Sequence, residues 1–169
     1  TTGATRAAGT YGISGQGTGT FSGNFSVTGT ATFSILSGGT VAVTGPVSGY
    51  LGTVSKMDAG TLILSGSNSY YQATILNQGT IRAGSVYAFG TGPINVNDGA
   101  TLDLGGYAIS NRIRIRGGAT VLNAENYTGS QTVDTGTTTY VQTVTGSMVI
   151  APGALAKFDG MLDRKSTRL

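Results

Sequence analysis

The acidic side chains are the first residues in the sequence whose types could support chemistry. Outside the last seven residues the carboxylates are Asp58, Asp98, Asp103, Glu125, Asp134 and Asp159. Clustered carboxylates on neighbouring strands can cleave glycosidic bonds or hold calcium. The chain has no His and no Cys. This excludes Ser-His-Asp and Cys-His nucleophilic sites and the usual Cys/His zinc sites within the segment. We therefore expect no catalytic site, no metal site and no cofactor.

Three arginines form the densest group of charge. Arg112, Arg114 and Arg116 alternate with two isoleucines, so a strand here would present three cations on one exposed face. The pattern favours a solvated face that discourages aggregation. The alternative is a docking site for an anionic glycan or a lipopolysaccharide phosphate, because Arg binds phosphate in bidentate fashion. The stripe is short and has no interleaved aromatic residue, so we expect no nucleic-acid partner.

Tyrosines are a further candidate for ligand contact. Tyr70, Tyr71, Tyr87 and Tyr107 lie in uncharged segments rich in Gly and Ser. Such residues most often cover the edge of a core, but they could also stack against sugars. A surface ion pair is expected between Arg82 and Asp103, which share one position of the repeat described next.

All these residues sit in a repeat of about 20 residues. The phrase from Asp58 to Leu62 (DAGTL) is answered by the phrase from Asn77 to Ile81 (NQGTI). The threonine of this phrase recurs, with similar spacing, at Thr20, Thr40, Thr61, Thr80, Thr101 and Thr120. A fixed period of this length is typical of a solenoid with one coil per repeat.

Two strands are expected in each coil. After the threonine, apolar residues alternate with polar ones, as in Leu62 and Leu64, which indicates a half-buried strand. Before it, inward positions are expected seven residues back at Phe33, Val54, Ala73, Ile94 and Ile113. They are also expected five residues back at Ile35, Lys56, Ile75, Val96 and Ile115. Lys56 is the exception, and we expect either a slipped register or an ammonium group at the rim.

A turn joins the two strands. Asp58, Asn77 and Asp98 stand three residues before the threonine, and these types suit tight turns. We assign structural roles to the turn and repeat positions Asp58, Gly60, Thr61, Asn77, Gly79, Thr80, Asp98, Gly99 and Thr101. The expected fold is an all-β, right-handed parallel β-helix (β-solenoid). It forms one segment over residues 1–162, irregular at 1–19 and 123–146, with a last coil around Pro152 and Gly153.

The C-terminal tail distorts the charge balance. Residues 163–169 resemble one reading frame of a sequencing-library adapter, so we expect a non-native tail and exclude it from the fold. The whole chain carries a net charge of +3. The tail holds three of the ten Lys and Arg and one of the seven Asp and Glu, so the remainder is only +1. No apolar run approaches the ~18 residues of a membrane helix, so we expect no direct membrane insertion.

The central residues resemble a known family. The series Gly60-Thr61-Leu62, Leu64, Gly66, Asn68 and Tyr70, followed by Gly79-Thr80-Ile81, is similar to the autotransporter passenger-associated repeat. One departure is Tyr71-Gln72-Ala73, where copies in the family commonly have Thr-Gly-Gly. The resemblance implies a right-handed β-helix exported through the type V route and displayed at the bacterial cell surface or released outside the cell.

The resemblance also implies partners. These are a host or surface glycan or protein as an adhesion target, and a C-terminal outer-membrane β-barrel of the same polypeptide that lies outside these residues. It implies no reaction. Two alternatives remain open at this stage: a fragment of a secreted β-helical polysaccharide lyase or hydrolase, by analogy of fold alone, and a spike or fibre repeat that trimerises.

Overall fold

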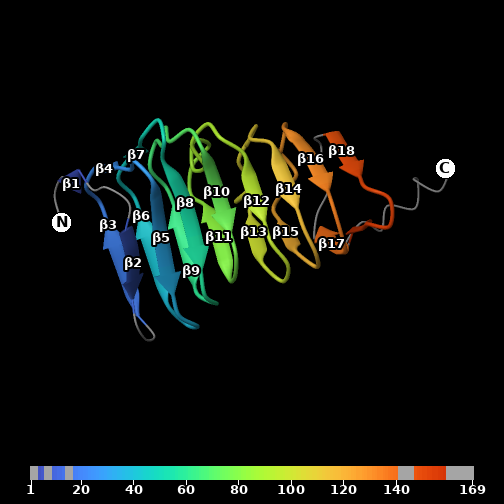
Figure 1. The fold of residues 1–169 in the computed structure, drawn as a ribbon, viewed down its shortest axis with the longest axis horizontal. Helices are drawn as coiled ribbons and strands as arrows, with labels where there is room; N and C mark the ends of the chain where they lie inside the picture. The colour runs from blue at the N-terminus through green and yellow to red at the C-terminus, as the bar shows by residue number, and fades with distance from the viewer. Residues whose placement is uncertain (1–3, 6–8, 14–16, 141–146, 159–169) are drawn as a thin grey trace.

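A computed structural model describes residues 4–5, 9–13, 17–140 and 147–158. In this part of the chain every regular element is a β-strand, and every strand pairing is parallel. Figure 1 shows the strands stacked along the long axis of the molecule, with β3 near one end and β18 near the other. The predicted all-β parallel solenoid is confirmed, with about 20 residues per coil.

Two long sheets form the walls of the solenoid. In spatial order the first contains the eight strands β2 (Gly9–Ile13), β5 (Thr30–Ile35), β8 (Thr53–Met57), β10 (Ala73–Leu76), β12 (Ile94–Val96), β14 (Ile113–Ile115), β16 (Ser130–Val133) and β18 (Ser147–Ile150). The second contains the eight strands β3 (Thr18–Phe21), β6 (Thr40–Val43), β9 (Thr61–Leu64), β11 (Thr80–Ala83), β13 (Thr101–Asp103), β15 (Thr120–Leu122), β17 (Thr137–Tyr140) and β19 (Leu155–Phe158).

The third side of the coils is mostly irregular. A short sheet of β1 (Ala4–Thr5), β4 (Phe25–Ser26) and β7 (Val47–Ser48) covers it at the N-terminal end. Farther along the chain, single backbone hydrogen bonds between coils replace that sheet, such as the bond from the Thr91 amide to the Tyr70 carbonyl. Because stacking in every coil satisfies backbone groups in this way, the third side can vary in length without breaking the solenoid.

The register of the second sheet follows the predicted columns from Thr40 onward. Thr40 lies opposite Thr61, and the column continues through Thr80, Thr101 and Thr120. The prediction was wrong for the first coil, where Thr18 rather than Thr20 lies opposite Thr40. That coil is longer because its third side carries the buried side chains of Phe25 and Val27 before β5 begins.

The register of the first sheet differs from the prediction by two residues at β5, where Ala31 rather than Phe33 lies opposite Val54, and by one residue at β10. Thr74, not Ala73, lies opposite Val54 and Ile94. Thr74 is therefore buried, and Ala73 and Ile75 point outward. A slip of one residue exchanges the two faces of a strand. A threonine is tolerated inside because its hydroxyl lies 2.6 Å from the hydroxyl of Tyr70.

Residues 123–140 are more regular than the sequence indicated. β16 and β17 continue the two long sheets, and Thr139 lies opposite Thr120 as the next member of the threonine column. Their inward positions include Gln131 and Thr138, which carry no hydrophobic signal. Residues 141–146 and the tail 163–169 lie outside the described residues, and the boundary of the domain at residue 162 stays a prediction.

Replacing Tyr70 with phenylalanine tests the polar contact inside the core. Tyr70 is fully buried, and Thr74 is its hydroxyl's only side-chain partner among the described residues. We expect Tyr70→Phe to lower the free energy of unfolding by about 1–2 kcal/mol, because the buried Thr74 hydroxyl loses its partner. Chemical denaturation followed by circular dichroism measures the change. Tyr107→Phe, at a partly exposed position, should change stability by less than about 0.5 kcal/mol.

Candidate functional site

The turn residues join neighbouring coils through their side chains. A carboxylate oxygen of Asp58 accepts a hydrogen bond from the Ser34 hydroxyl. Oδ1 of Asp98 accepts one from the Gly118 amide at 2.6 Å. Asn77 donates to the Ser55 hydroxyl at 3.1 Å and accepts from Asn97 at 2.9 Å. These side chains satisfy polar groups of the preceding or the following coil, as expected for a structural turn rather than for a reacting group.

Backbone geometry explains the residue types at these turns. Asp58 has a φ of 64°, and Gly79 and Gly99 have φ values of 69° and 70°. This left-handed region is open to Gly and more tolerable for Asp and Asn than for other residues. Gly60 is buried with ordinary φ, but a Cβ there would collide with the carbonyl oxygen of Leu36 in the preceding coil. Close stacking of coils therefore requires the glycine.

Lys56 lies inside the solenoid rather than at its rim. Lys56 lies opposite Phe33 and Leu76 instead of the predicted Ile35 and Ile75, and its side chain is fully buried. The ammonium donates to the carbonyl oxygens of Met57 and Asp58, each at 2.6 Å, and to that of Gln78 at 3.2 Å. Burial lowers the pKa of Lys56 from 10.5 to about 8, and the nearby Asp58 carboxylate opposes part of that shift. The register at Lys56 is slipped relative to the predicted column, whereas the expected ammonium at the rim was wrong.

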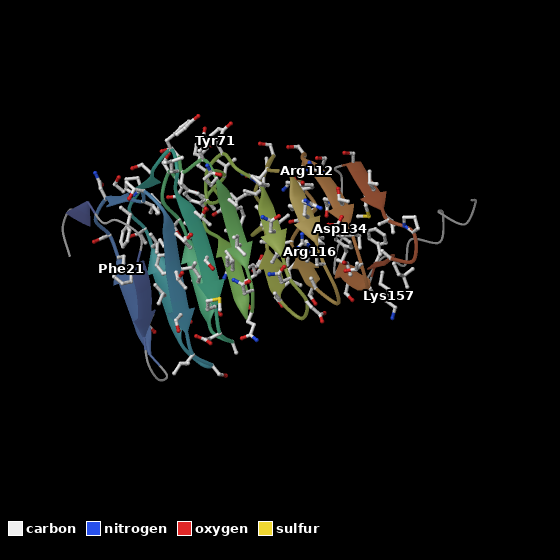
Figure 2. All side chains as sticks on the ribbon, in the orientation of Figure 1. Phe21, Tyr71, Arg112, Arg116, Asp134 and Lys157 are labelled. Atoms are coloured by element: carbon white, nitrogen blue, oxygen red, sulfur yellow. The ribbon has the colours of Figure 1, made fainter. Side chains whose placement is uncertain are left out.

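The three arginines lie around β14 on the outer face of the first sheet. Figure 2 shows Arg116 close to Asp134 and Arg112 farther toward the top of the molecule. Asp134, which follows β16, forms ion pairs with two of these arginines. Its Oδ2 lies 2.9 Å from Nη2 of Arg114 and 3.9 Å from Nε of Arg116. Arg112 is exposed, and no described carboxylate lies within 4 Å of it. The group therefore presents one unpaired cation and two compensated ones.

Replacing Asp134 tests how much its ion pairs with the arginines contribute to the stability of the fold. We expect Asp134→Ala to cost less than about 1 kcal/mol of stability at low salt, because the ion pairs are partly exposed and screened. The cost should fall further in 1 M salt, where the Debye length is about 3 Å. Denaturation at two salt concentrations measures it. A loss of several kcal/mol that persists at high salt would show that Asp134 has another role.

The predicted pair of Arg82 and Asp103 is also present. Nε of Arg82 lies 3.5 Å from Oδ2 of Asp103 on the neighbouring coil. The other oxygen of Asp103 accepts hydrogen bonds from Asn123 at 2.6 Å and from the Gly105 amide at 2.8 Å. This carboxylate is thus engaged by three groups of the fold. Among the described residues, no three His, Cys, Asp or Glu side chains lie together in a way that could hold a metal ion.

The two neighbouring tyrosines of the third side have opposite environments. Tyr70 is fully buried, and burial raises its pKa well above the ordinary value. It does not reach solvent, so the sugar-stacking role considered for it is not open. Tyr71 is 54% exposed and stacks on Tyr50 of the preceding coil, with ring centroids 5.2 Å apart and planes 16° apart. Tyr50 was not among the candidate contacts, although it follows Gly49 in a segment of the same composition.

Sequence reasoning missed the role of Asn68. This side chain is buried and bridges three coils. Its oxygen accepts a hydrogen bond from the Val47 amide at 2.8 Å, and its nitrogen donates to the Ala88 carbonyl at 2.6 Å. The signal was available, because Asn68 belongs to the series of residues that resembles the passenger repeat, two positions before the buried Tyr70.

The comparisons with known proteins add a relative. Over 112 residues, which is 63% of this chain, the sequence is 38% identical to the adhesin BmaC autotransporter of Brucella suis biovar 1 (strain 1330). The matched part is about 3% of that protein's length. No family model and no solved structure matches the chain. Among the described residues, no helix is long and apolar enough to cross a membrane. The fold and this similarity together confirm the resemblance: the chain is a parallel β-solenoid related in sequence to an autotransporter adhesin.

Proposed function

We propose that the chain is part of the β-helical passenger of an autotransporter-like protein, displayed at the bacterial cell surface or released from it, and that it contributes to adhesion. The observation that carries the proposal is the unbroken stack of parallel coils in a chain that is similar to an autotransporter adhesin. A solenoid of this kind holds outward-facing loops at a fixed spacing along a rigid axis. Its role is therefore mechanical and adhesive rather than catalytic.

The hydrogen bonds accepted by the aspartate side chains support this function over the enzymatic alternative. Asp58, Asp98 and Asp103 each accept hydrogen bonds from a neighbouring coil, and Asp134 accepts from Arg114. Carboxylates engaged by the fold in this way are poor candidates for acid–base catalysis. The partners in this function are a host or surface glycan or protein, and an outer-membrane β-barrel of the same polypeptide that anchors or exports it.

Surface labelling of bacteria that carry the uninterrupted gene tests the proposal. Antibodies raised against the 169-residue chain should label intact cells, and external protease should remove the label. The matched variant is a deletion of residues 61–100, which removes two whole coils and places Thr101 after Gly60. Because the stack can close on the same column of threonines, we expect display to persist and adhesion to host cells to fall. Intact cells that are not labelled, while permeabilised cells are, would refute surface display.

A further inference from the structure

The Tyr50–Tyr71 pair forms a stacked aromatic surface on the third side. Tyr50 is 76% exposed and Tyr71 is 54% exposed, and the adjacent Leu51 is 58% exposed. Large apolar side chains usually face the core, and here the neighbouring Tyr70 does so. The two exposed rings do not cover the core. They stack on each other and point out from successive coils, as the label of Tyr71 in Figure 2 shows for one of them.

Backbone pairing fixes what lies beside the pair. The Tyr71 amide donates to the Gly49 carbonyl, and in the next coil the Thr91 amide donates to the Tyr70 carbonyl. Thr91 therefore takes the place of Tyr71 one coil further along, at a coil spacing of about 4.8 Å. Thr91 is exposed and small. One face of the Tyr71 ring is covered by Tyr50, and the column continues beyond the ring with a hydroxyl in place of a third aromatic side chain.

The surroundings carry no charge. The three third-side segments 44–52, 65–73 and 84–93 contain no Asp, Glu, Lys or Arg, although they contain Ser, Thr, Asn and Gln. A ligand with a carboxylate, sulfate or phosphate would have no cation to meet there. A protein partner needs roughly 800 Å² of contact surface on each side, more than two rings and one leucine supply. A flat, uncharged ligand with both an apolar face and hydroxyl groups fits this combination.

We propose that the Tyr50–Tyr71 pair binds a neutral pyranose unit of a glycan. The C–H face of the sugar stacks on the tyrosine ring, and its hydroxyl groups bond to the tyrosine and threonine hydroxyls of the column. This inference rests on the proposed adhesive function and names the class of its target. A single sugar contacts only the end of one stack, so binding is weak for one chain. It becomes useful when many copies act together at a cell surface.

Binding of defined saccharides to the 169-residue chain tests the inference. The probes are cellotetraose, maltotetraose and lacto-N-tetraose, together with sialylated and sulfated counterparts of lacto-N-tetraose, and saturation-transfer NMR detects the contact. At least one neutral probe should bind, and Tyr71→Thr should weaken it at least tenfold. Threonine at this position is what the next coil carries, so the variant fits the stack. Tyr71→Phe keeps the stacking ring but loses one hydroxyl, so its binding should fall between that of the parent and that of Tyr71→Thr. The control Tyr107→Thr on another coil should bind as the parent does.

Three results would overturn the inference. The first is binding of charged probes alone, lost in Arg112→Ala, which would assign the contact to the arginines. The second is binding of a neutral probe that is equally strong in Tyr50→Thr and Tyr71→Thr with unchanged circular dichroism. The third is no binding of any probe at millimolar concentration. None of these affects the labelling of intact cells, so failure of the sugar site is distinguishable from failure of surface display.

Discussion

The free energy of unfolding should rise by about 2 kcal/mol between pH 7 and pH 9.5, and Lys56 is the group responsible. Inside the fold its pKa is about 8, below the ordinary value of 10.5. At pH 9.5 the folded protein has released this proton, whereas the unfolded chain still holds it. Wherever the unfolded state binds more protons, stability increases with pH. The rise begins as the pH passes 8 and would end near 10.5.

Tyrosines limit the upper end of this window. Burial raises the pKa values of Tyr70, Tyr127 and Tyr140 above 10. These groups stay neutral in the folded state while they ionise in the unfolded chain, so their contribution to stability is complete below pH 10 and is lost above it. The two effects have opposite signs, and the contribution of Lys56 is isolated between pH 7.5 and about 9.5.

Urea denaturation across this pH range measures the effect, and the chain offers a matched control. Lys56→Met keeps the length of the side chain and removes the charge, so the rise should disappear. At pH 7 the variant should be no more stable than the parent, because the loss of the donor to the carbonyl oxygens of Met57, Asp58 and Gln78 offsets the gain from removing a buried charge. Lys157→Met removes an exposed lysine and should keep the rise. A parent protein whose stability is flat from pH 7 to 9.5 would contradict the buried, desolvated state of Lys56.

The second sheet was predictable because its strands start at a fixed signal. From β6 to β15 each of them starts at a Thr with a Gly one or two residues before it, and the buried residues Leu62, Ile81 and Leu102 show which face points inward. The first sheet has no such marker. In β10 the residues Ala73 and Ile75 suggested one face, and the structure uses the other. The alternation of apolar and polar residues cannot show that the Thr74 hydroxyl has a hydrogen-bond partner in Tyr70, because the two residues lie on different elements of the coil.

The candidate site shows the same division between local and long-range information. The sequence placed Tyr70 and Tyr71 together in an uncharged segment but could not decide which ring faces solvent. That choice depends on Tyr50, which lies 21 residues earlier in the sequence and directly against Tyr71 in space. Likewise, Asp134 compensates two arginines from a segment that was expected to be irregular. Contacts between coils decide both questions, and a short motif does not encode them.

Asn68→Ala should destabilise the chain by about 3 kcal/mol, because a buried side chain that bridges neighbouring coils is lost. Asn68 is 5% exposed and satisfies one amide and one carbonyl on the two coils that flank it, at Val47 and Ala88. Alanine would leave both backbone groups without their partner, and each such loss costs about 1–3 kcal/mol. Urea denaturation at pH 7 measures the loss. Asn126→Ala is the matched control, because Asn126 makes one hydrogen bond to the Gly106 carbonyl at an exposed position.

Asn68→Asp separates the two bonds of this bridge. At pH 7 the ionised carboxylate can still accept from the Val47 amide, but it cannot donate to the Ala88 carbonyl and it places a charge in the interior. The variant should therefore be less stable than Asn68→Ala at neutral pH. At pH 4 and below, a protonated carboxyl group regains one donor, so part of the loss should be recovered relative to the parent. Equal stability of Asn68→Asp and the parent at pH 7 would mean that the bridge does not hold the three coils together.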